Sequence, residues 1–193
     1  YPVKLEYTRE DDMAAGWYRP MNIHKMRVAL DGLGNISAWE NRVVGQSLIA
    51  KTPLAFMMQE GVDHLSIEGA GMLPYHIPNI NVDTHHSESG VPVTFWRSVG
   101  HTHTQFSKET MMDEALIAAG KDPIQGRLDL MDDERSMAVI RQVAEISNWN
   151  ATAPEGIGRG FAFTEAFGGR VAQVAEVTRD SNGRICVNKV YCV

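Results

Sequence analysis

Apolar and polar residues alternate in the first part of the chain, which is typical of half-buried strands. The turn residues Asp31-Gly32-Leu33-Gly34-Asn35 separate two alternating stretches, residues 26–30 and 36–44, and predict a β-hairpin. Residues 3–8 also alternate, so the chain is expected to begin within a strand, followed by a polar loop over residues 11–20. Further on, we expect a short strand and loop over residues 79–89 and an apolar strand over residues 92–99.

Helical periodicity replaces alternation in the middle of the chain. Residues 105–119 are expected to form a helix with one apolar face (Met111, Met112, Ala115, Leu116 and Ala119) and an acidic face opposite (Glu109, Asp113 and Glu114). A second helix is predicted from Asp132 or Asp133 to about Trp149, because its apolar residues recur at helical spacing. Residues 51–59 are compatible with either a short helix or a loop.

The last part of the chain returns to alternation. Three stretches, residues 160–167, 170–178 and 184–193, are separated by the turn residues Gly168-Gly169 and Ser181-Asn182-Gly183, which predicts a three-stranded meander. Strands, then two main helices, then strands indicate an α+β fold with an antiparallel sheet. We expect a single domain over residues 1–193.

Charge and composition exclude some classes of function. The net charge of -6 argues against nucleic acid as the main partner, since that role requires a basic face. No run of residues approaches the roughly 18 apolar residues of a membrane-spanning helix. The two cysteines, Cys186 and Cys192, are too few to form a zinc site by themselves.

The segment before the first long helix is the best candidate for chemistry. We call Trp96-Arg97-Ser98-Val99-Gly100 the arginine turn. Helix N-termini present unpaired N–H groups and positive potential, so an arginine among small residues at that position predicts an anion site. Taken alone, the turn is better explained by an arginine that bridges loop carbonyl groups.

The order of motifs along the chain resembles one family. Near the start these motifs are Pro2-Val3-Lys4-Leu5, Thr8-Arg9-Glu10-Asp11-Asp12-Met13 and Tyr18-Arg19-Pro20. They are followed by Tyr75-x-Ile77-Pro78-Asn79, the arginine turn, Phe106-x-x-Glu109, Asp113-Glu114, Gly120-x-Asp122-Pro123, Arg127, and a closing segment from Ala175 to Val193. This order resembles the molybdopterin-binding large subunit of the molybdenum hydroxylases, the xanthine dehydrogenase and aldehyde oxidase family. It is most similar to the branch that contains the beta subunits of isoquinoline 1-oxidoreductases and bacterial aldehyde dehydrogenases.

The resemblance implies a cofactor, a reaction and a partner. The complete subunit would bind molybdopterin, with Trp96, Arg97, Ser98, Val99 and Gly100 against the cofactor. It would hydroxylate an aldehyde or an N-heterocycle with oxygen from water and pass electrons to an iron–sulfur subunit or domain. The family's glutamate base is expected beyond Val193 and its glycine-rich cofactor loop before Tyr1. The chain is therefore expected to be an internal fragment that is inactive by itself. Its compartment in a bacterium stays open: cytoplasmic, periplasmic or membrane-associated.

Departures from the family pattern narrow the expected substrate. The arginine turn commonly reads Phe-Arg-Gly-Phe-Gly in the family, whereas Val99 here gives an aliphatic wall in place of an aromatic ring. Ser66 lies near the position where the purine enzymes have a substrate-anchoring arginine. Both features argue against a purine substrate.

Two other classes of function remain as alternatives. A non-catalytic α+β module could mediate subunit contacts without touching a cofactor. His85-His86 and His101-x-His103 could instead form the metal site of a metallohydrolase, although these histidines lack the spacing of a helical zinc motif. We expect no metal ligands here and interpret the histidines as residues of surface loops. Gly156-Ile157-Gly158-Arg159-Gly160 follows a helix and precedes a strand, so it is predicted to be a turn and not a phosphate loop.

Overall fold

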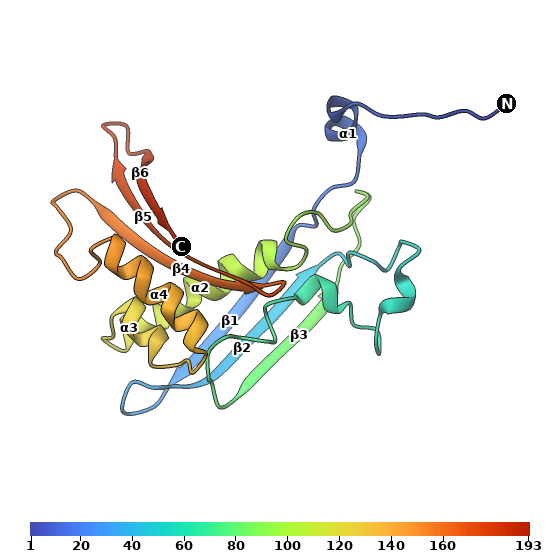
Figure 1. Cartoon of the computed structure of the whole chain (residues 1–193). Helices are drawn as coiled ribbons and strands as arrows, with labels where there is room; N and C mark the ends of the chain where they lie inside the picture. Colours follow the sequence, from blue (N-terminus) through green and yellow to red (C-terminus); the bar gives the residue numbers. More distant parts are fainter.

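The computed structural model describes residues 1–193 and contains two three-stranded sheets (Figure 1). The first sheet has the order β1 (Asn22–Leu30), β2 (Ile36–Gly45) and β3 (Ile80–His86). The second has the order β4 (Gly158–Ala166), β5 (Gly169–Arg179) and β6 (Ile185–Cys192). The α-helices are α1 (Arg9–Ala15), α2 (His101–Ala118), α3 (Pro123–Leu128) and α4 (Glu134–Ile146), with short 3-10 helices at Ala55–Met57 and His64–Ile67. The predicted α+β class is confirmed.

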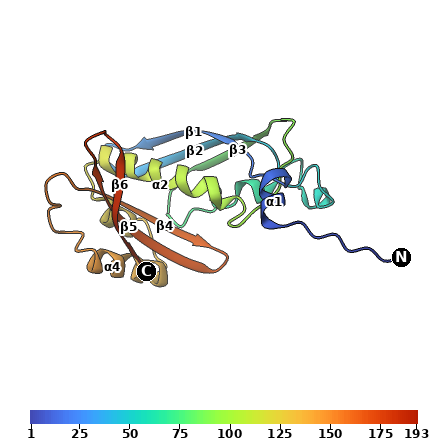
Figure 2. The same cartoon turned by 90° about the horizontal axis from the view of Figure 1, so that it is seen from above.

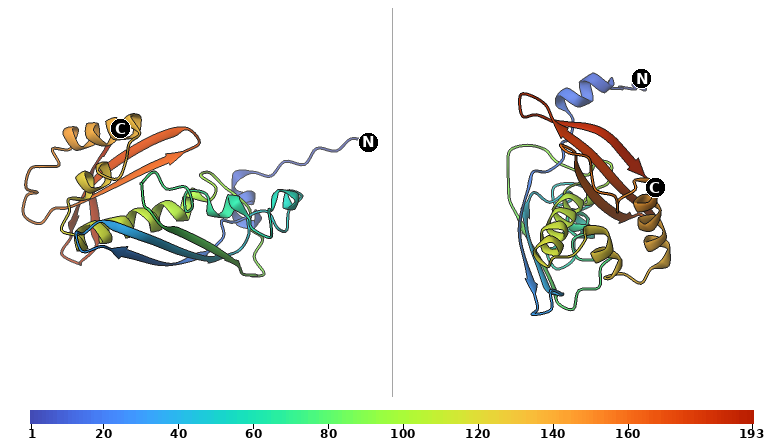
Figure 3. Two further views of the ribbon diagram at one scale, coloured as in Figure 1. Left: turned by 90° about the horizontal axis from the view of Figure 1, so that it is seen from below. Right: turned by 90° about the vertical axis from the view of Figure 1, so that its left-hand side faces the viewer.

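Helix α2 lies between the two sheets, while α3 and α4 lie beside the second sheet (Figures 2 and 3). One buried cluster connects these layers. Its members include Trp39 of β2, Met112 of α2, Ile140 of α4 and Phe163 of β4, none more than 1% exposed. Each such large apolar side chain contributes about 1.5–3 kcal/mol on burial, so this cluster fixes α2 against both sheets. No helix in the chain is long and apolar enough to span a membrane bilayer.

Two of the hairpins are closed in the same way by an aspartate. Asp31 accepts hydrogen bonds from the N–H groups of Leu33 and Asn35, at 2.8 and 2.9 Å, and thereby closes the β1–β2 turn. Asp180 accepts equivalent bonds two and four residues ahead in the β5–β6 turn. Aspartates favour such turns because the short side chain reaches the following main chain. These contacts explain why the hairpins and the β4–β5–β6 meander were predictable.

The N-terminal segment differs from its prediction. Residues 1–8 form no strand, because no neighbouring strand supplies hydrogen-bond partners, and the segment projects away from the body (Figure 1). Part of the predicted loop over residues 11–20 is the helix α1. The Thr8 side chain accepts from the Asp11 N–H, and the Asp11 side chain accepts from the Thr8 N–H. This reciprocal capping box stabilises the start of α1.

Other differences concern the middle of the chain. Residues 92–99 were predicted to be a strand, but they form only an isolated bridge between Val93 and Tyr18. Helix α2 begins at His101, four residues before the predicted start, and the short helix α3 was not predicted. Strand β3 pairs with β2 in parallel, so the first sheet is mixed and not wholly antiparallel. Helix α4 matches its prediction, with Asp133 as its N-cap.

Candidate functional site

The arginine turn lies on the surface directly before α2. The Val99 N–H donates to the carbonyl oxygen of Trp96 over 3.0 Å and closes the turn. Ser98 and Val99 have φ angles of 74° and 46°, in the left-handed region that residues with a Cβ rarely adopt. Such residues cost about 1–3 kcal/mol each and persist only where the surrounding structure holds them. The turn therefore has a conformation that its own residues do not favour.

Only the main chain of Arg97 is engaged within the protein. Its carbonyl oxygen accepts hydrogen bonds from Nη2 of Arg19 at 3.1 Å and from Oγ1 of Thr102 at 3.2 Å. The Arg97 guanidinium is exposed and contacts no acidic or carbonyl group closely enough to bond with it. The arginine thus does not bridge loop carbonyl groups, and its guanidinium is free to bind an anionic or carbonyl group of a ligand.

Gly100 ends the turn in close contact with the 3-10 helix His64–Ile67. A Cβ on Gly100 would lie 2.3 Å from the carbonyl oxygen of Leu65, so no larger residue fits without movement. Burial raises the pKa of the neighbouring Glu68, and a hydrogen bond from the Gly100 N–H opposes this rise. The Glu68 side chain therefore lies at the positive N-terminus of α2.

Two hollows adjoin the arginine turn. The first, of about 400 Å³, combines the aromatic residues Trp96, Phe95 and Trp17 with the charged residues Arg9 and Asp12. The second, of about 610 Å³, includes Ser98 and combines polar with aromatic groups: Arg19, His101, Thr102, Gln105, Phe106 and Phe167. The turn therefore contributes residues to two hollows whose linings both combine polar and apolar groups.

The histidines of α2 do not converge on one site. Nδ1 of His103 lies 2.8 Å from Nε2 of His24, and Nδ1 of His24 lies 3.1 Å from Oδ1 of Asn41. The His101 ring instead packs edge-on against Phe167, with ring centres 5.5 Å apart. No three histidine, cysteine or acidic side chains approach closely enough to bind one metal ion. This geometry gives no support to the metallohydrolase hypothesis. His101 and His103 are half-buried in α2, and His85 and His86 are exposed in β3, so none of them lies in a surface loop as we expected.

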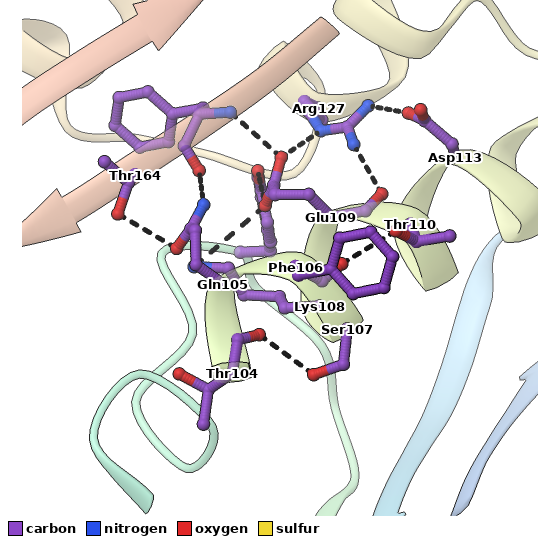
Figure 4. A network of polar contacts seen from close by, with 12 residues as sticks. Thr104, Gln105, Phe106, Ser107, Lys108, Glu109, Thr110, Asp113, Arg127 and Thr164 are labelled. Carbon is purple, nitrogen blue, oxygen red and sulfur yellow. Dashed lines mark hydrogen bonds and ion pairs between the residues drawn. The ribbon is translucent and has the colours of Figure 1, made fainter. Parts of the chain in front are cut away.

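A buried polar network, which the sequence analysis missed, connects α2 with α3 and β4 (Figure 4). Arg127 is 0% exposed; its Nε donates to Oε2 of Glu109 over 3.0 Å, and its Nη1 lies 2.6 Å from Oδ1 of Asp113. Oε2 of Glu109 also accepts from the Phe163 N–H at 3.0 Å, and Oε1 accepts from the Tyr75 hydroxyl at 2.9 Å. The network thus satisfies both oxygens of a carboxylate that is only 4% exposed.

The network positions the helix that follows the arginine turn. The Gln105 side chain, one turn before Glu109, donates to the Phe163 carbonyl oxygen and accepts from the Thr164 hydroxyl at 2.9 Å. Together, Gln105 and Glu109 bind both main-chain polar groups of Phe163 on the edge of β4 that faces α2. Helical periodicity placed Glu109 on a solvent-facing side because an acidic residue opposite an apolar face is usually exposed.

Comparison with known proteins shows which family the chain belongs to. Residues 1–130 match the molybdopterin cofactor-binding domain family. The chain is 30% identical over 197 residues to the beta subunit of isoquinoline 1-oxidoreductase from Brevundimonas diminuta, a match that covers 98% of this chain and 25% of that protein. It is 26% identical over 214 residues to a nicotinate dehydrogenase subunit from Pseudomonas putida, covering 98% of this chain and 18% of that protein.

Solved structures share the fold. Quinoline 2-oxidoreductase from Pseudomonas putida 86 superposes with a TM-score of 0.63 at 18% identity, covering 94% of this chain and 28% of that one. Aldehyde oxidoreductase from Desulfovibrio gigas superposes with a TM-score of 0.53 at 20% identity, covering 89% of this chain and 21% of that one. The chain spans between 18% and 28% of the length of these four proteins. As the order of its motifs predicted, the chain belongs to the molybdopterin cofactor-binding domain family of the molybdenum hydroxylases.

Proposed function

We propose that this chain is part of the catalytic subunit of a molybdenum-dependent oxidoreductase that hydroxylates an aldehyde or an N-heterocycle. Water would supply the oxygen atom. One observation about individual residues supports the proposal. The Arg97 guanidinium is exposed, has no partner within the chain and projects from a strained turn, and the chain belongs to a molybdopterin-binding family. Exposed arginines are common, but strain in the main chain is concentrated at functional sites.

The residues of the arginine turn fit a molybdopterin. A guanidinium can donate two parallel hydrogen bonds to a phosphate or to the polar edge of a pterin. The small side chain of the exposed Ser98 leaves room for a planar ring beside the main chain, whereas Gly100 is buried against Leu65 and adjoins the ligand only through the turn. When bound, the molybdenum cofactor supplies the two-electron redox chemistry of the hydroxylation. The part proposed for Arg97 is to neutralise negative charge and orient the ligand, while Trp96 and Val99 provide apolar contact.

The substrate proposed for the whole enzyme is an aldehyde or a non-purine N-heterocycle. Val99 offers an aliphatic surface where the xanthine-oxidase pattern has an aromatic ring. Ser66, near the position of the purine-anchoring arginine, is buried and donates to Asp63 over 2.6 Å. Its hydroxyl is therefore engaged in holding the 3-10 helix and not in anchoring a substrate. We propose that electrons leave through an iron–sulfur subunit or domain.

We further propose that the 193-residue chain is inactive when isolated. The resemblance assigns the glycine-rich cofactor loop and the glutamate base to sequence outside residues 1–193. The purified chain should then contain no molybdenum and oxidise no aldehyde. Stoichiometric molybdenum in the purified chain, measured by elemental analysis, would contradict this part of the proposal.

The test of the arginine turn is Arg97→Ala in the full-length subunit. Losing the charge-assisted hydrogen bonds should lower molybdenum and pterin content on the order of tenfold at limiting cofactor. Arg97→Lys should have an intermediate content, because lysine keeps the charge but not the paired donors. Arg135→Ala is the matched control, since Arg135 is exposed on α4 and far from the turn in sequence. Unchanged cofactor content in Arg97→Ala would refute the assignment and favour the subunit-contact module.

A further inference from the structure

We propose that Arg19 and Thr102 form a lock that holds the peptide group between Arg97 and Ser98 in one orientation. Arg19 is thus a positioning residue for the arginine turn, although it lies 78 residues from Arg97 in sequence. The consequence of the lock for cofactor binding rests on the proposed function. The lock itself is a property of the main chain and can be tested without cofactor.

Two donors from separate segments converge on one oxygen atom. Nη2 of Arg19, in the segment between α1 and β1, donates to the Arg97 carbonyl oxygen over 3.1 Å. Oγ1 of Thr102, in the first turn of α2, donates to the same oxygen over 3.2 Å. A carbonyl oxygen has two lone pairs, so these two bonds use its full capacity.

The locked peptide group has an alternative that its own residues favour. Rotating this peptide plane by about half a turn would carry the φ angle of Ser98 from 74° into the negative region preferred by L-residues. The same rotation would turn the Arg97 carbonyl oxygen away from Arg19 and Thr102 and break both hydrogen bonds. Strain at Ser98 therefore favours the rotation, and the two donors oppose it.

The lock also fixes the direction of a main-chain donor. All peptide bonds in the chain are trans, so the Ser98 N–H points to the side opposite the Arg97 carbonyl oxygen. The Val99 N–H is occupied by Trp96, whereas the Ser98 N–H donates to no acceptor within the chain. The locked orientation thus presents one free N–H on the face of the turn that is turned away from Arg19, where a hydrogen-bond acceptor of a ligand can reach it.

Arg19 is itself held in place by contacts with the segment that enters the turn. Its neighbour Tyr18 donates its N–H to Pro92 and accepts from the Thr94 N–H, both at 3.1 Å. The Arg19 guanidinium also lies 5.4 Å from the centre of the Trp96 ring, a cation–π distance. Main-chain hydrogen bonds therefore join the segment before β1 to the segment before α2, and this places the exposed Arg19 next to the strained peptide group.

The experiment determines the orientation of the Arg97–Ser98 peptide group by crystallography of the full-length subunit prepared without cofactor. The reporter is the direction of the Arg97 carbonyl oxygen, because rotating the central peptide of a β-turn leaves the hydrogen bond from the Val99 N–H to Trp96 in place. Arg19→Ala and Thr102→Val should each raise the ratio of rotated to locked peptide groups about three- to tenfold, as expected for loss of one exposed hydrogen bond. Arg135→Ala, which removes an exposed arginine from α4, should leave the orientation unchanged.

A second substitution separates the lock from general packing. Glycine adopts positive φ angles without steric cost, so Ser98→Gly removes the strain that drives the rotation. In the Arg19→Ala background, Ser98→Gly should therefore restore the locked orientation of the peptide group in at least half of the molecules that lost it. In reconstituted subunits, molybdenum and pterin content should fall in Arg19→Ala and recover in the double variant.

The possible outcomes distinguish this inference from the proposed function. An unchanged orientation of the peptide group in both single variants would overturn the lock, while the assignment of Arg97 would still be judged by Arg97→Ala. A rotated peptide group that Ser98→Gly fails to restore would also overturn it, because the rotation would then come from altered packing and not from strain. A restored orientation would support the lock. Combined with unchanged cofactor content, it would contradict only the link between the lock and cofactor binding.

Discussion

Replacing Glu109 with alanine tests how the buried network holds α2 in position. The two Glu109 oxygens accept hydrogen bonds from Arg127, Tyr75 and the Phe163 N–H. Alanine would leave the fully buried Arg127 with Asp113 as its only close acidic partner. It would also leave a hydroxyl and an N–H group without their acceptor. It would also remove the carboxylate that lies 4.0 Å from Nζ of the buried Lys108. The substitution therefore leaves two buried charges only partly compensated, together with two unpaired donors.

The expected cost follows from these losses. Removing one partner of a buried ion pair costs about 3–5 kcal/mol, and each unpaired buried donor costs about 1–3 kcal/mol. The terms do not add, because the groups share one network and Arg127 keeps its bonds to the carbonyl oxygens of Pro123 and residue 109. We expect Glu109→Ala to lower the free energy of unfolding by about 4 kcal/mol, a large part of a typical total stability. Glu109→Gln keeps the shape and one acceptor, so its expected cost is about 2 kcal/mol.

Urea unfolding of the chain, followed by circular dichroism and tryptophan fluorescence, measures these differences. Glu114→Ala on the same helix is the control; Glu114 is exposed, and its replacement should change stability by less than about 0.5 kcal/mol. A loss below about 1 kcal/mol for Glu109→Ala, with an unchanged dependence on urea, would refute the reasoning. It would mean that the apolar cluster, and not the network, fixes α2.

Three further predictions concern pH and packing. Burial and a neighbouring histidine lower the pKa of His103 to about 4, so the unfolded chain binds a proton at this residue more readily than the folded chain does. The free energy of unfolding should therefore fall as pH decreases from about 6.5 to 4. His103→Gln should flatten that part of the plot of stability against pH. Burial raises the pKa of Tyr75 well above its ordinary value, so the folded chain keeps the phenol proton at a pH where the unfolded chain loses it. The urea concentration at the unfolding midpoint should therefore fall above about pH 10, and it should fall less in Tyr75→Phe. Gly100→Ala should lower the melting temperature by several degrees through overlap with Leu65, whereas Gly71→Ala, with nothing within 4 Å of its Cβ, should not.

The elements predicted correctly are those whose cause lies within a few residues. Asp31 and Asp180 each close a hairpin with N–H groups two and four residues ahead. Asp133 caps α4 in the same local way, by accepting from the Ser136 N–H over 2.8 Å. The capping box of Thr8 and Asp11 was an equally local signal, and α1 was missed because the acidic run was interpreted as solvated loop. Local hydrogen-bonding signals therefore sufficed for these turns and for the start of α4, whereas local alternation alone wrongly predicted strands over residues 3–8 and 92–99.

The elements predicted wrongly depend on contacts between distant segments. Alternation identified β3 as a strand, but its parallel pairing with β2 depends on the path of residues 46–79 between them. Periodicity placed Glu109 on the polar face of α2, yet that face is covered by α3 and β4, which bring Arg127 and the Phe163 N–H to the carboxylate. A helical pattern reports which residues are apolar. It does not report which polar residues will meet a buried partner.

The arginine turn depends both on local sequence and on a contact between distant segments. The motif around Arg97 identified the candidate residues, because residue type and spacing are properties of the sequence. The conformation of the turn is not such a property: Ser98 has no intrinsic preference for a positive φ angle and adopts it next to a carbonyl group bound by Arg19. Where a family pattern has glycine, the chain needs no such support, but with serine at position 98 it requires a donor from a distant segment. Serine at position 98 raises the conformational energy of the turn, and the turn therefore depends on Arg19, a contact that is seen only in the folded chain.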